Sequence, residues 1–153
     1  MENHPTPCLI GLDWGTSSFR GWLLDADGQV LDLFHADLGI LKVSNNDFEG
    51  VYHHHLDPWF EIHGTLPVIA SGMIGSRQGW LEAPYVSCPS GPEEIAEQMA
   101  YVPQEDKNYS PLMAIVPGMN HWNQGVPDVM RGEETQVFGA MGNENQHVIY
   151  ILP

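Results

Sequence analysis

The sequence predicts an α/β fold, in which helices pack on a mixed β-sheet. Two observations predict it. Three short apolar runs follow one another closely in the first 36 residues, as in an antiparallel meander, and later runs of the same kind alternate with segments of helical apolar spacing. The chain has 153 residues, the size of one ordinary domain with a single core.

The meander is expected at residues 8–13 (CLIGLD), 19–25 (FRGWLLD) and 29–36 (QVLDLFHA). Each is a short apolar run typical of a buried strand. A stretch of small polar residues separates the first two. Asp27-Gly28 supplies the second turn, because both residues tolerate positive φ.

Helices are expected at three places, residues 47–60, 90–99 and 133–141, where apolar residues recur at helical spacing or a capping pattern occurs. Pro58 must bend, end or restart the first helix. Ser90 with Glu93 forms a capping-box pattern for the second, and Pro92 is acceptable in its first turn.

Further strands are expected at residues 66–70 (LPVIA), 112–116 (LMAIV) and 147–152 (HVIYIL). The last run lies at the carboxyl end, and as a strand it should pair with another strand. Pairing with a second copy, which would make a homo-oligomer, is one way to satisfy it.

Composition limits the partners. The chain has 20 acidic and 5 basic residues, a formal net charge of −15, which repels nucleic acid and acidic membrane surfaces, so we expect neither as a partner. The amino terminus lacks the features of a leader, and no run approaches the roughly 18 apolar residues that span a bilayer. With Cys8 and Cys88 expected as reduced thiols, the sequence predicts a soluble cytoplasmic protein.

The segment DWGTSS, residues 13–18, stands between the first two expected strands. A turn there can present backbone amides and hydroxyls to a phosphate, and Gly15 permits close approach. The neighbouring carboxylate of Asp13 would hold Mg²⁺, which prefers oxygen ligands and keeps much of its water. The alternative is a structural hairpin whose Ser and Thr side chains bond to local backbone groups.

This segment, followed by two more strands, resembles the first phosphate motif of the superfamily of sugar kinases, actin and heat-shock chaperones. Three other stretches resemble the 2-dehydro-3-deoxygalactonokinase family: ASGMIGSRQGWLEAPY (70–85), IVPGM (115–119) and PDVMRGEETQVFGA (127–140). The resemblance covers nearly the whole chain, and its motifs are long and specific.

The resemblance implies a ribonuclease H-like, actin-like ATPase lobe with a mixed five-stranded sheet and helices packed on it. It implies that residues 1–146 form the amino-terminal lobe of a sugar kinase and that residues 147–153 form the first strand of a second lobe. In this superfamily the second lobe carries the adenine pocket and much of the phosphate grip, so the chain alone is expected to bind ATP poorly.

The activity implied is ATP-dependent phosphorylation of 2-dehydro-3-deoxy-D-galactonate at its 6-hydroxyl. ATP and Mg²⁺ would lie at Asp13, Gly15, Thr16 and Ser17, with Asp13 as the metal contact. One alternative is an inactive lobe that binds a sugar acid without phosphoryl transfer. Another is an actin-like filament ATPase, in which the glycine-rich loop around Arg77 would have no purpose.

For the sugar acid, the resemblance points to the loop GSRQGW. The guanidinium of Arg77 offers donors that match a carboxylate, and we assign Ser71, Ser76, Trp80 and, farther along the chain, Arg131 to the same substrate. The alternative for Arg77 is an ion pair with a surface acid such as Glu82.

The resemblance also places an acid at the end of the first lobe that accepts the proton of the attacking hydroxyl. GEETQVFG resembles that stretch with one residue fewer, so we assign this role to Glu133, with Asp128 as the second choice. The alternative is that Glu133 and Glu134 only stabilise a helix amino terminus.

Overall fold

The computed structural model describes residues 5–104 and 112–141. Its main feature is a six-stranded mixed sheet in the order β3-β2-β1-β4-β7-β6. The six strands are β1 (Pro7–Trp14), β2 (Phe19–Asp25), β3 (Val30–Ala36), β4 (Val68–Ser71), β6 (Ala100–Val102) and β7 (Met113–Ile115). The first three form the predicted antiparallel meander, and β4 and β7 continue the sheet in parallel with β1. The α/β class is therefore confirmed.

The prediction of a five-stranded sheet was wrong by one edge strand. β6 pairs antiparallel with β7 and follows directly after α2 (Pro92–Glu97), where a longer helix was expected. α2 is capped by Gly91, whose amide donates to the carboxylate of Glu94 at 2.7 Å, so the capping acid is not Glu93. Of the three residues of β6 only Val102 is buried, so no apolar run indicates a strand there, unlike the equally short β7.

A second, three-stranded sheet was also missed. It has the order β5-β8-β9, formed by β5 (Tyr85–Ser87), β8 (Gly118–Asn123) and β9 (Val126–Met130). β8 and β9 make a hairpin whose turn residues, Gln124 and Gly125, both have positive φ. All five residues of β9 are exposed, so this sheet has little of the apolar pattern that indicates a strand.

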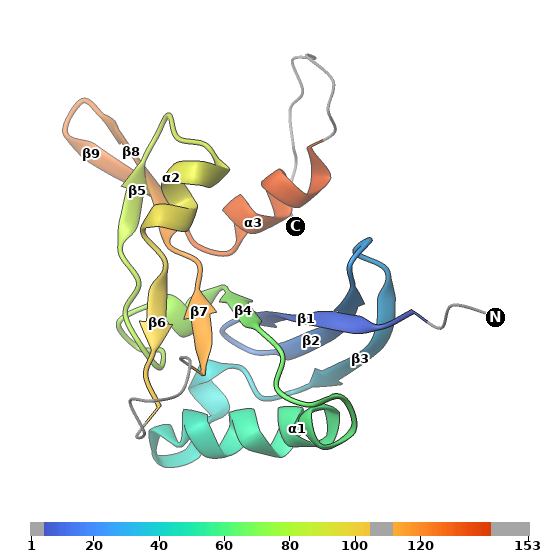
Figure 1. Cartoon of the computed structure of the whole chain (residues 1–153). Coiled ribbons are helices and arrows are strands. Elements are labelled where there is room, and N and C mark those ends of the chain that lie inside the picture. Colours follow the sequence, from blue (N-terminus) through green and yellow to red (C-terminus); the bar gives the residue numbers. More distant parts are fainter. Residues whose placement is uncertain (1–4, 105–111, 142–153) are drawn as a thin grey trace.

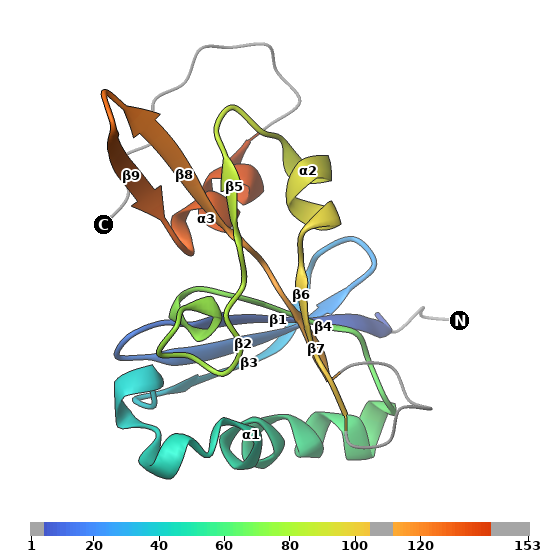
Figure 2. The same cartoon turned by 90° about the vertical axis from the view of Figure 1, so that its left-hand side faces the viewer.

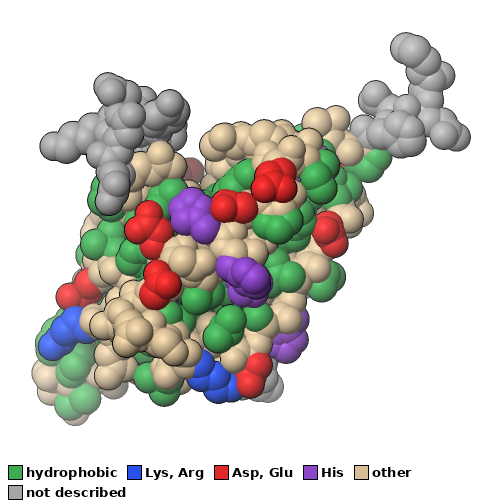
Figure 3. Space-filling model, turned by 90° about the horizontal axis from the view of Figure 1, so that it is seen from below, with side chains coloured by type: hydrophobic (Ala, Val, Ile, Leu, Met, Phe, Trp, Pro, Cys, Tyr) green, Lys and Arg blue, Asp and Glu red, His purple; other side chains and the backbone are tan. Residues whose placement is uncertain are grey.

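Helix α1 (Phe48–His63) covers one face of the main sheet (Figures 1 and 2). Asp47 caps it by accepting a hydrogen bond from the amide of Gly50 at 2.9 Å. Pro58 lies inside this helix without ending it, because it sits on the exposed side, where water can solvate the carbonyl that loses its donor. On the face seen from below, acidic and histidine side chains are interspersed among uncharged ones (Figure 3).

Strand β1 separates the core from the open face of the sheet. Its alternate residues Ile10, Leu12 and Trp14 are buried in the core with the apolar side of α1. Leu9, Gly11 and Asp13 point the other way, toward α3 (Glu133–Ala140). The period-two alternation of a strand thus puts the one acid of β1 on the open face.

Several other predictions have outcomes here. Cys8 and Cys88 are both free. No helix within residues 5–104 and 112–141 has the length and apolar character needed to cross a membrane. The strand expected at 147–152, and with it the boundary between residues 146 and 147, lies outside the described residues.

Candidate active site

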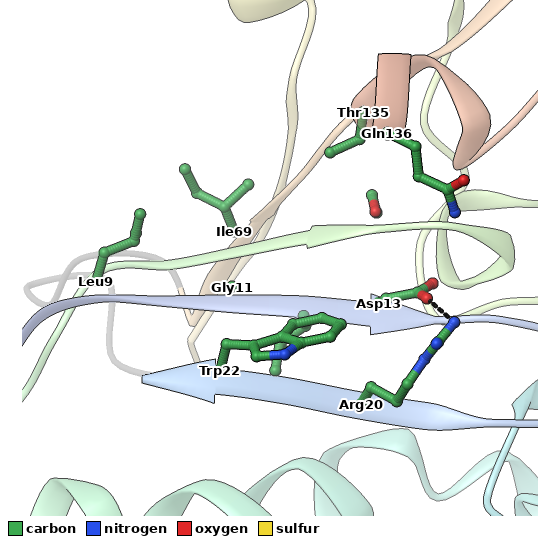
Figure 4. Close-up of a pocket in the computed structure, with 10 residues that line it drawn as sticks. Leu9, Gly11, Asp13, Arg20, Trp22, Ile69, Thr135 and Gln136 are labelled. Carbon is green, nitrogen blue, oxygen red and sulfur yellow. Dashed lines mark hydrogen bonds and ion pairs between the residues drawn. The ribbon is translucent and has the colours of Figure 1, made fainter. Parts of the chain in front are cut away.

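Asp13 lies at the carboxyl end of β1, where three strands meet on the open face. It is in register with Arg20 on β2 and with Ser71 on β4. Its Oδ2 accepts a hydrogen bond from Nη2 of Arg20 at 2.5 Å (Figure 4). Both side chains keep contact with solvent, 24% for Asp13 and 45% for Arg20, so this acid is not sealed in the core.

A hollow of about 350 Å³ opens above these residues. Its floor is the sheet face, and Thr135 and Gln136 of α3 lie above it (Figure 4). Ser71, 8% exposed, belongs to this hollow. We had assigned Ser71 to the sugar acid, and the structure places it beside Asp13 instead of beside Arg77.

The turn after Asp13 is partly used by the fold itself. The amide of Gly15 donates to the carbonyl of Ser18 at 2.9 Å, and the carbonyl of Gly15 accepts from the amide of Ile40 at 2.9 Å. A Cβ on Gly39 would stand 2.2 Å from the amide nitrogen of Ser17, so the following loop presses against the turn. The side chains of Thr16 and Ser17 are exposed, so their hydroxyl groups remain available to a ligand.

Two glycines bring the start of α3 to this edge of the sheet. A Cβ on Gly132 would lie 3.3 Å from the Cα of Gly72, which directly follows β4. Gly72 in turn approaches the Asp13 carboxylate, because its own added Cβ would stand 3.2 Å from Oδ1. The close approach depends on the absence of side chains at both positions.

A second hollow, of about 410 Å³, contains three of the predicted substrate residues, Ser76, Arg77 and Arg131, with Glu82 and Tyr85. The Arg77 side chain is 88% exposed and its Nε lies 3.7 Å from Oε1 of Glu82, the ion pair we had considered as the alternative. Arg131 reaches inward and donates from Nη2 to the carbonyl of Ala83 at 2.9 Å.

Trp80 is half-buried and packs against the main core. Its ring stacks on Phe48 at 6.5 Å between centroids and makes edge contacts with Trp14 and Tyr52. It is not among the residues that line the hollow of Arg77 and Arg131.

The acidic side chains near α3 differ in their exposure to solvent. Glu133 and Asp128 line a third hollow beside β8 and β9, and Oε2 of Glu133 accepts the amide of Arg131 at 2.9 Å. Glu134 is 1% exposed, and both of its carboxylate oxygens accept the amide of Gly132, at 2.8 and 2.9 Å. Burial raises the pKa of Glu134 above its usual value, although the hydrogen bond from Gly132 partly offsets the effect.

Glu134 is the feature that sequence reasoning did not single out. Three acids lie within seven residues here, and the sequence alone could not say which of them the helix turns inward. The only available signal was the adjacency of two glutamates after Gly132, because successive helical residues point about 100° apart.

The donor set around Asp13 fits a largely hydrated Mg²⁺. Arg20 engages Oδ2, whereas Oδ1 faces the side-chain-free backbone of Gly72. In the described part of the chain, no cluster of three His, Cys, Asp or Glu side chains is close enough to bind a metal on its own. One carboxylate, with water and ligand oxygens, is the coordination that Mg²⁺ commonly has beside a phosphate.

The chain is similar to known proteins over most of its length. A family model described as 2-keto-3-deoxy-galactonokinase matches residues 13–153. A Rhizobium meliloti protein named probable 2-dehydro-3-deoxygalactonokinase is 40% identical over 129 residues, 84% of this chain and 40% of that protein. The 2-dehydro-3-deoxygalactonokinase of Escherichia coli is 31% identical over 148 residues, 97% of this chain and 47% of that protein.

A solved structure is similar as well. The crystal structure of a Sinorhizobium meliloti protein, described as a 2-dehydro-3-deoxygalactonokinase, superimposes with a TM-score of 0.75 at 39% identity and covers 86% of this chain and 42% of that chain. The chain therefore spans less than half the length of the relatives that it matches.

Proposed function

The chain belongs to the 2-keto-3-deoxy-galactonokinase family, and from this we propose that it serves the ATP-dependent phosphorylation of 2-dehydro-3-deoxy-D-galactonate at its 6-hydroxyl. We further propose that residues 1–146 form the first lobe of such a kinase and residues 147–153 begin a second. The antiparallel meander continued by two parallel strands supports a ribonuclease H-like lobe, to which β6 is an edge addition.

The nucleotide phosphates are proposed to lie over the hollow of Asp13. Oδ1 of Asp13 would hold Mg²⁺ through water, and the hydroxyls of Thr16 and Ser17 would contact phosphate oxygens together with Gly15 at the bend. Bound there, Mg²⁺ would offset the charge of the transferred phosphoryl group. Arg20 keeps the Asp13 side chain in place from the neighbouring strand.

The sugar acid is proposed to occupy the hollow of Arg77 and Arg131. In a chain of net charge −15, two of the five basic residues line this one hollow. Guanidinium groups bind carboxylates with paired hydrogen bonds, so a negatively charged ligand is favoured here despite the acidic surroundings. Ser76 would contribute a hydroxyl to the same ligand.

The observation that carries the proposal is the short segment between the two hollows. Arg131 lines one of them, and Thr135 and Gln136 line the other. Glu133 lies between them in the sequence, and its side chain lines the third hollow together with Asp128, so the proposed role requires this carboxylate to turn toward the bound sugar acid. In this assignment Glu133 accepts the proton of the 6-hydroxyl, the hydroxyl oxygen bonds to the γ-phosphorus, and the bond from that phosphorus to ADP breaks.

The test is a coupled assay of ADP formation with ATP, Mg²⁺ and 2-dehydro-3-deoxy-D-galactonate, run on a two-lobed protein that carries this chain as its first lobe. We expect ADP release that depends on the sugar acid, and a loss of at least about 100-fold in kcat for Glu133→Gln. Asp128→Asn is the matched control on exposed β9, with a smaller loss expected. An Asp128→Asn loss larger than that of Glu133→Gln would transfer the role to Asp128.

Binding without transfer is the competing possibility, and the names of the relatives, which are kinases, disfavour it. Calorimetry separates the two. A titration with Mg·ATP gives heat if the chain is a kinase lobe, whereas a sugar acid site without nucleotide binding gives heat only with the sugar acid. Absence of ADP from the two-lobed protein with every 2-keto-3-deoxy acid tried would overturn the kinase proposal.

A further inference from the structure

Arg131 has an unusual environment for a cation. It follows β9, and its guanidinium lies against the Ala83 carbonyl and under the ring of Tyr85, with Cζ 4.3 Å from the ring centroid. Gly75 makes room for it, because a Cβ there would stand 2.9 Å from Nη1. Nε and Nη1 are both buried and have no hydrogen-bond partner among the described residues.

The other described basic side chains are paired. Arg20 bonds to Asp13, Lys42 to Asp37, and Arg77 lies near Glu82. Within residues 5–104 and 112–141, Arg131 forms no such pair. The charge of Glu134 acts on Arg131 without forming an ion pair with it, and buried polar atoms in native proteins are nearly always hydrogen-bonded. Nε and Nη1 therefore remain able to donate to a bound ligand.

The chemistry of that ligand follows from the donors. One of the two Nη2 hydrogens of Arg131 is bonded to Ala83, and the other can pair with the hydrogen of Nε or of Nη1 on one edge of the planar group, beside a hollow with the polar side chains of Ser76 and Gln78. A planar anion with two acceptor oxygens matches such a group. Among the groups of a sugar acid, only the carboxylate has this form and charge.

We propose that Arg131 is the principal carboxylate anchor of this site and that Arg77, at the rim, has a secondary, attracting role. This inference rests on the proposed function, because it assigns an atom of the sugar acid to a particular residue. Access requires the Tyr85 ring, 39% exposed, to shift from its place over the guanidinium. The ion pair of Arg77 with Glu82 is solvent-exposed, and such a cation adds little to binding.

The test compares two ligands, 2-dehydro-3-deoxy-D-galactonate and its neutral methyl ester, titrated calorimetrically into the chain. Wild type is expected to prefer the acid by about 10- to 100-fold, the scale of hydrogen bonds to a charged group. Arg131→Gln should reduce this preference to within about threefold. Arg131→Lys keeps the positive charge but cannot form the two parallel hydrogen bonds of a guanidinium, so it should retain only part of the preference for the acid over the ester.

Two matched variants serve as controls. Arg77→Gln removes a cation from the rim and should leave most of the preference for the acid, and Tyr85→Phe, which keeps the ring over Arg131, should leave all of it. The preference ratio compares two ligands on the same folded protein, so a purely structural role of Arg131 would not change it. Arg131→Lys serves as the measured variant if Arg131→Gln does not fold.

The outcomes are distinct. A wild-type chain that binds neither ligand contradicts the proposed function and this inference with it. A wild-type chain that prefers the acid, with the preference fully retained in Arg131→Gln and Arg131→Lys, contradicts the inference alone. A preference that disappears in Arg77→Gln and persists in both Arg131 variants would make Arg77 the anchor.

Discussion

Gly132 and Gly72 lie against each other, so that a Cβ on Gly132 would stand 3.3 Å from the Cα of Gly72. Both have positive φ, 109° and 97°, a region that side chains rarely adopt. This contact joins the start of α3 to the end of β4, and through Gly72 to the carboxylate of Asp13. The arrangement of the proposed site thus depends on two backbone segments that approach without side chains.

Gly72→Ala should destabilise the protein more than an ordinary glycine replacement at positive φ. The new Cβ would lie 2.9 Å from the Trp14 carbonyl oxygen, in addition to the strain of the left-handed conformation. Gly64→Ala is the matched control, because Gly64 has φ 78° and no atom within 4 Å of its added Cβ. We expect a loss of about 1 kcal/mol for Gly64→Ala and at least about 1 kcal/mol more for Gly72→Ala, measured by urea unfolding. Equal losses would contradict this account.

Tyr52→Phe tests a buried hydrogen bond that ties α1 to the sheet. The Tyr52 hydroxyl, on a residue 1% exposed, donates to the carbonyl of Leu112 at 2.8 Å. Removing it leaves that carbonyl without its donor, and we expect a loss of about 1–3 kcal/mol in the free energy of unfolding. Tyr101→Phe, at a side chain 56% exposed, should change it by less than about 0.5 kcal/mol. If both variants unfold at the same urea concentration as wild type, the bond does not contribute.

The same tyrosine predicts instability in alkali. Burial raises the pKa of Tyr52 well above its usual value, and the charge of Asp57 adds to the effect. The unfolded chain therefore loses this proton first, near pH 10, and the stability associated with it declines as the pH rises further. The advantage of wild type over Tyr52→Phe should accordingly shrink between pH 9 and about pH 11. An advantage that grows over this range would contradict the direction of the shift.

Glu134→Gln should stabilise the protein at neutral pH. Burial raises the pKa of Glu134, so the folded chain holds this proton at a pH where the unfolded chain has lost it. The stability that the protonated side chain provides is complete below about pH 4.5 and is lost as the pH rises through the folded-state pKa. Glutamine keeps the shape and the acceptor for the Gly132 amide without the buried charge.

The gain from Glu134→Gln should therefore be present at pH 7 and absent at pH 4, in melting curves recorded at both. Glu133→Gln is the matched control at the neighbouring, half-buried position, and no gain at pH 7 is expected there because its charge is partly hydrated. A gain of equal size at both pH values would show that the effect comes from packing and not from the proton.

The sequence predicted the main sheet well, because its strands are apolar on at least one face. The runs at residues 8–13 and 19–25 nearly coincide with β1 and β2, and their alternation places Asp13 opposite the core. The second sheet could not be found in this way, since β9 is exposed along its whole length and β5 has three residues. In addition, its β5–β8 pairing joins segments far apart in the sequence.

The sequence indicated which residues belong to the candidate site, but not how those residues are arranged. The motif around Asp13 and the loop of Arg77 could be found from residue types. Which arginine packs against the fold depends on tertiary contacts, because Arg77 and Arg131 are equally polar in the sequence, yet the Arg77 side chain is 88% exposed and Arg131 lies beneath Tyr85. The same holds for Glu133 and Glu134, which differ by one position on a helix and have opposite environments.

Asp13→Asn tests the proposed metal contact at the centre of the site. The change removes the charge but keeps the size of the side chain, so Mg·ATP should bind at least about tenfold more weakly in calorimetry. Stability should change by less than about 1 kcal/mol, because the pair with Arg20 is partly exposed.

Arg20→Gln breaks the same ion pair from the other side and leaves the carboxylate in place. If Asp13 binds Mg²⁺, this variant should bind Mg·ATP as well as wild type or better, because Oδ2 no longer has a competing cation. If Asp13 only anchors Arg20, both variants should weaken binding alike. The comparison therefore separates a metal contact from an ion pair that shapes the turn, and equal losses in the two variants would remove Asp13 from the proposed role.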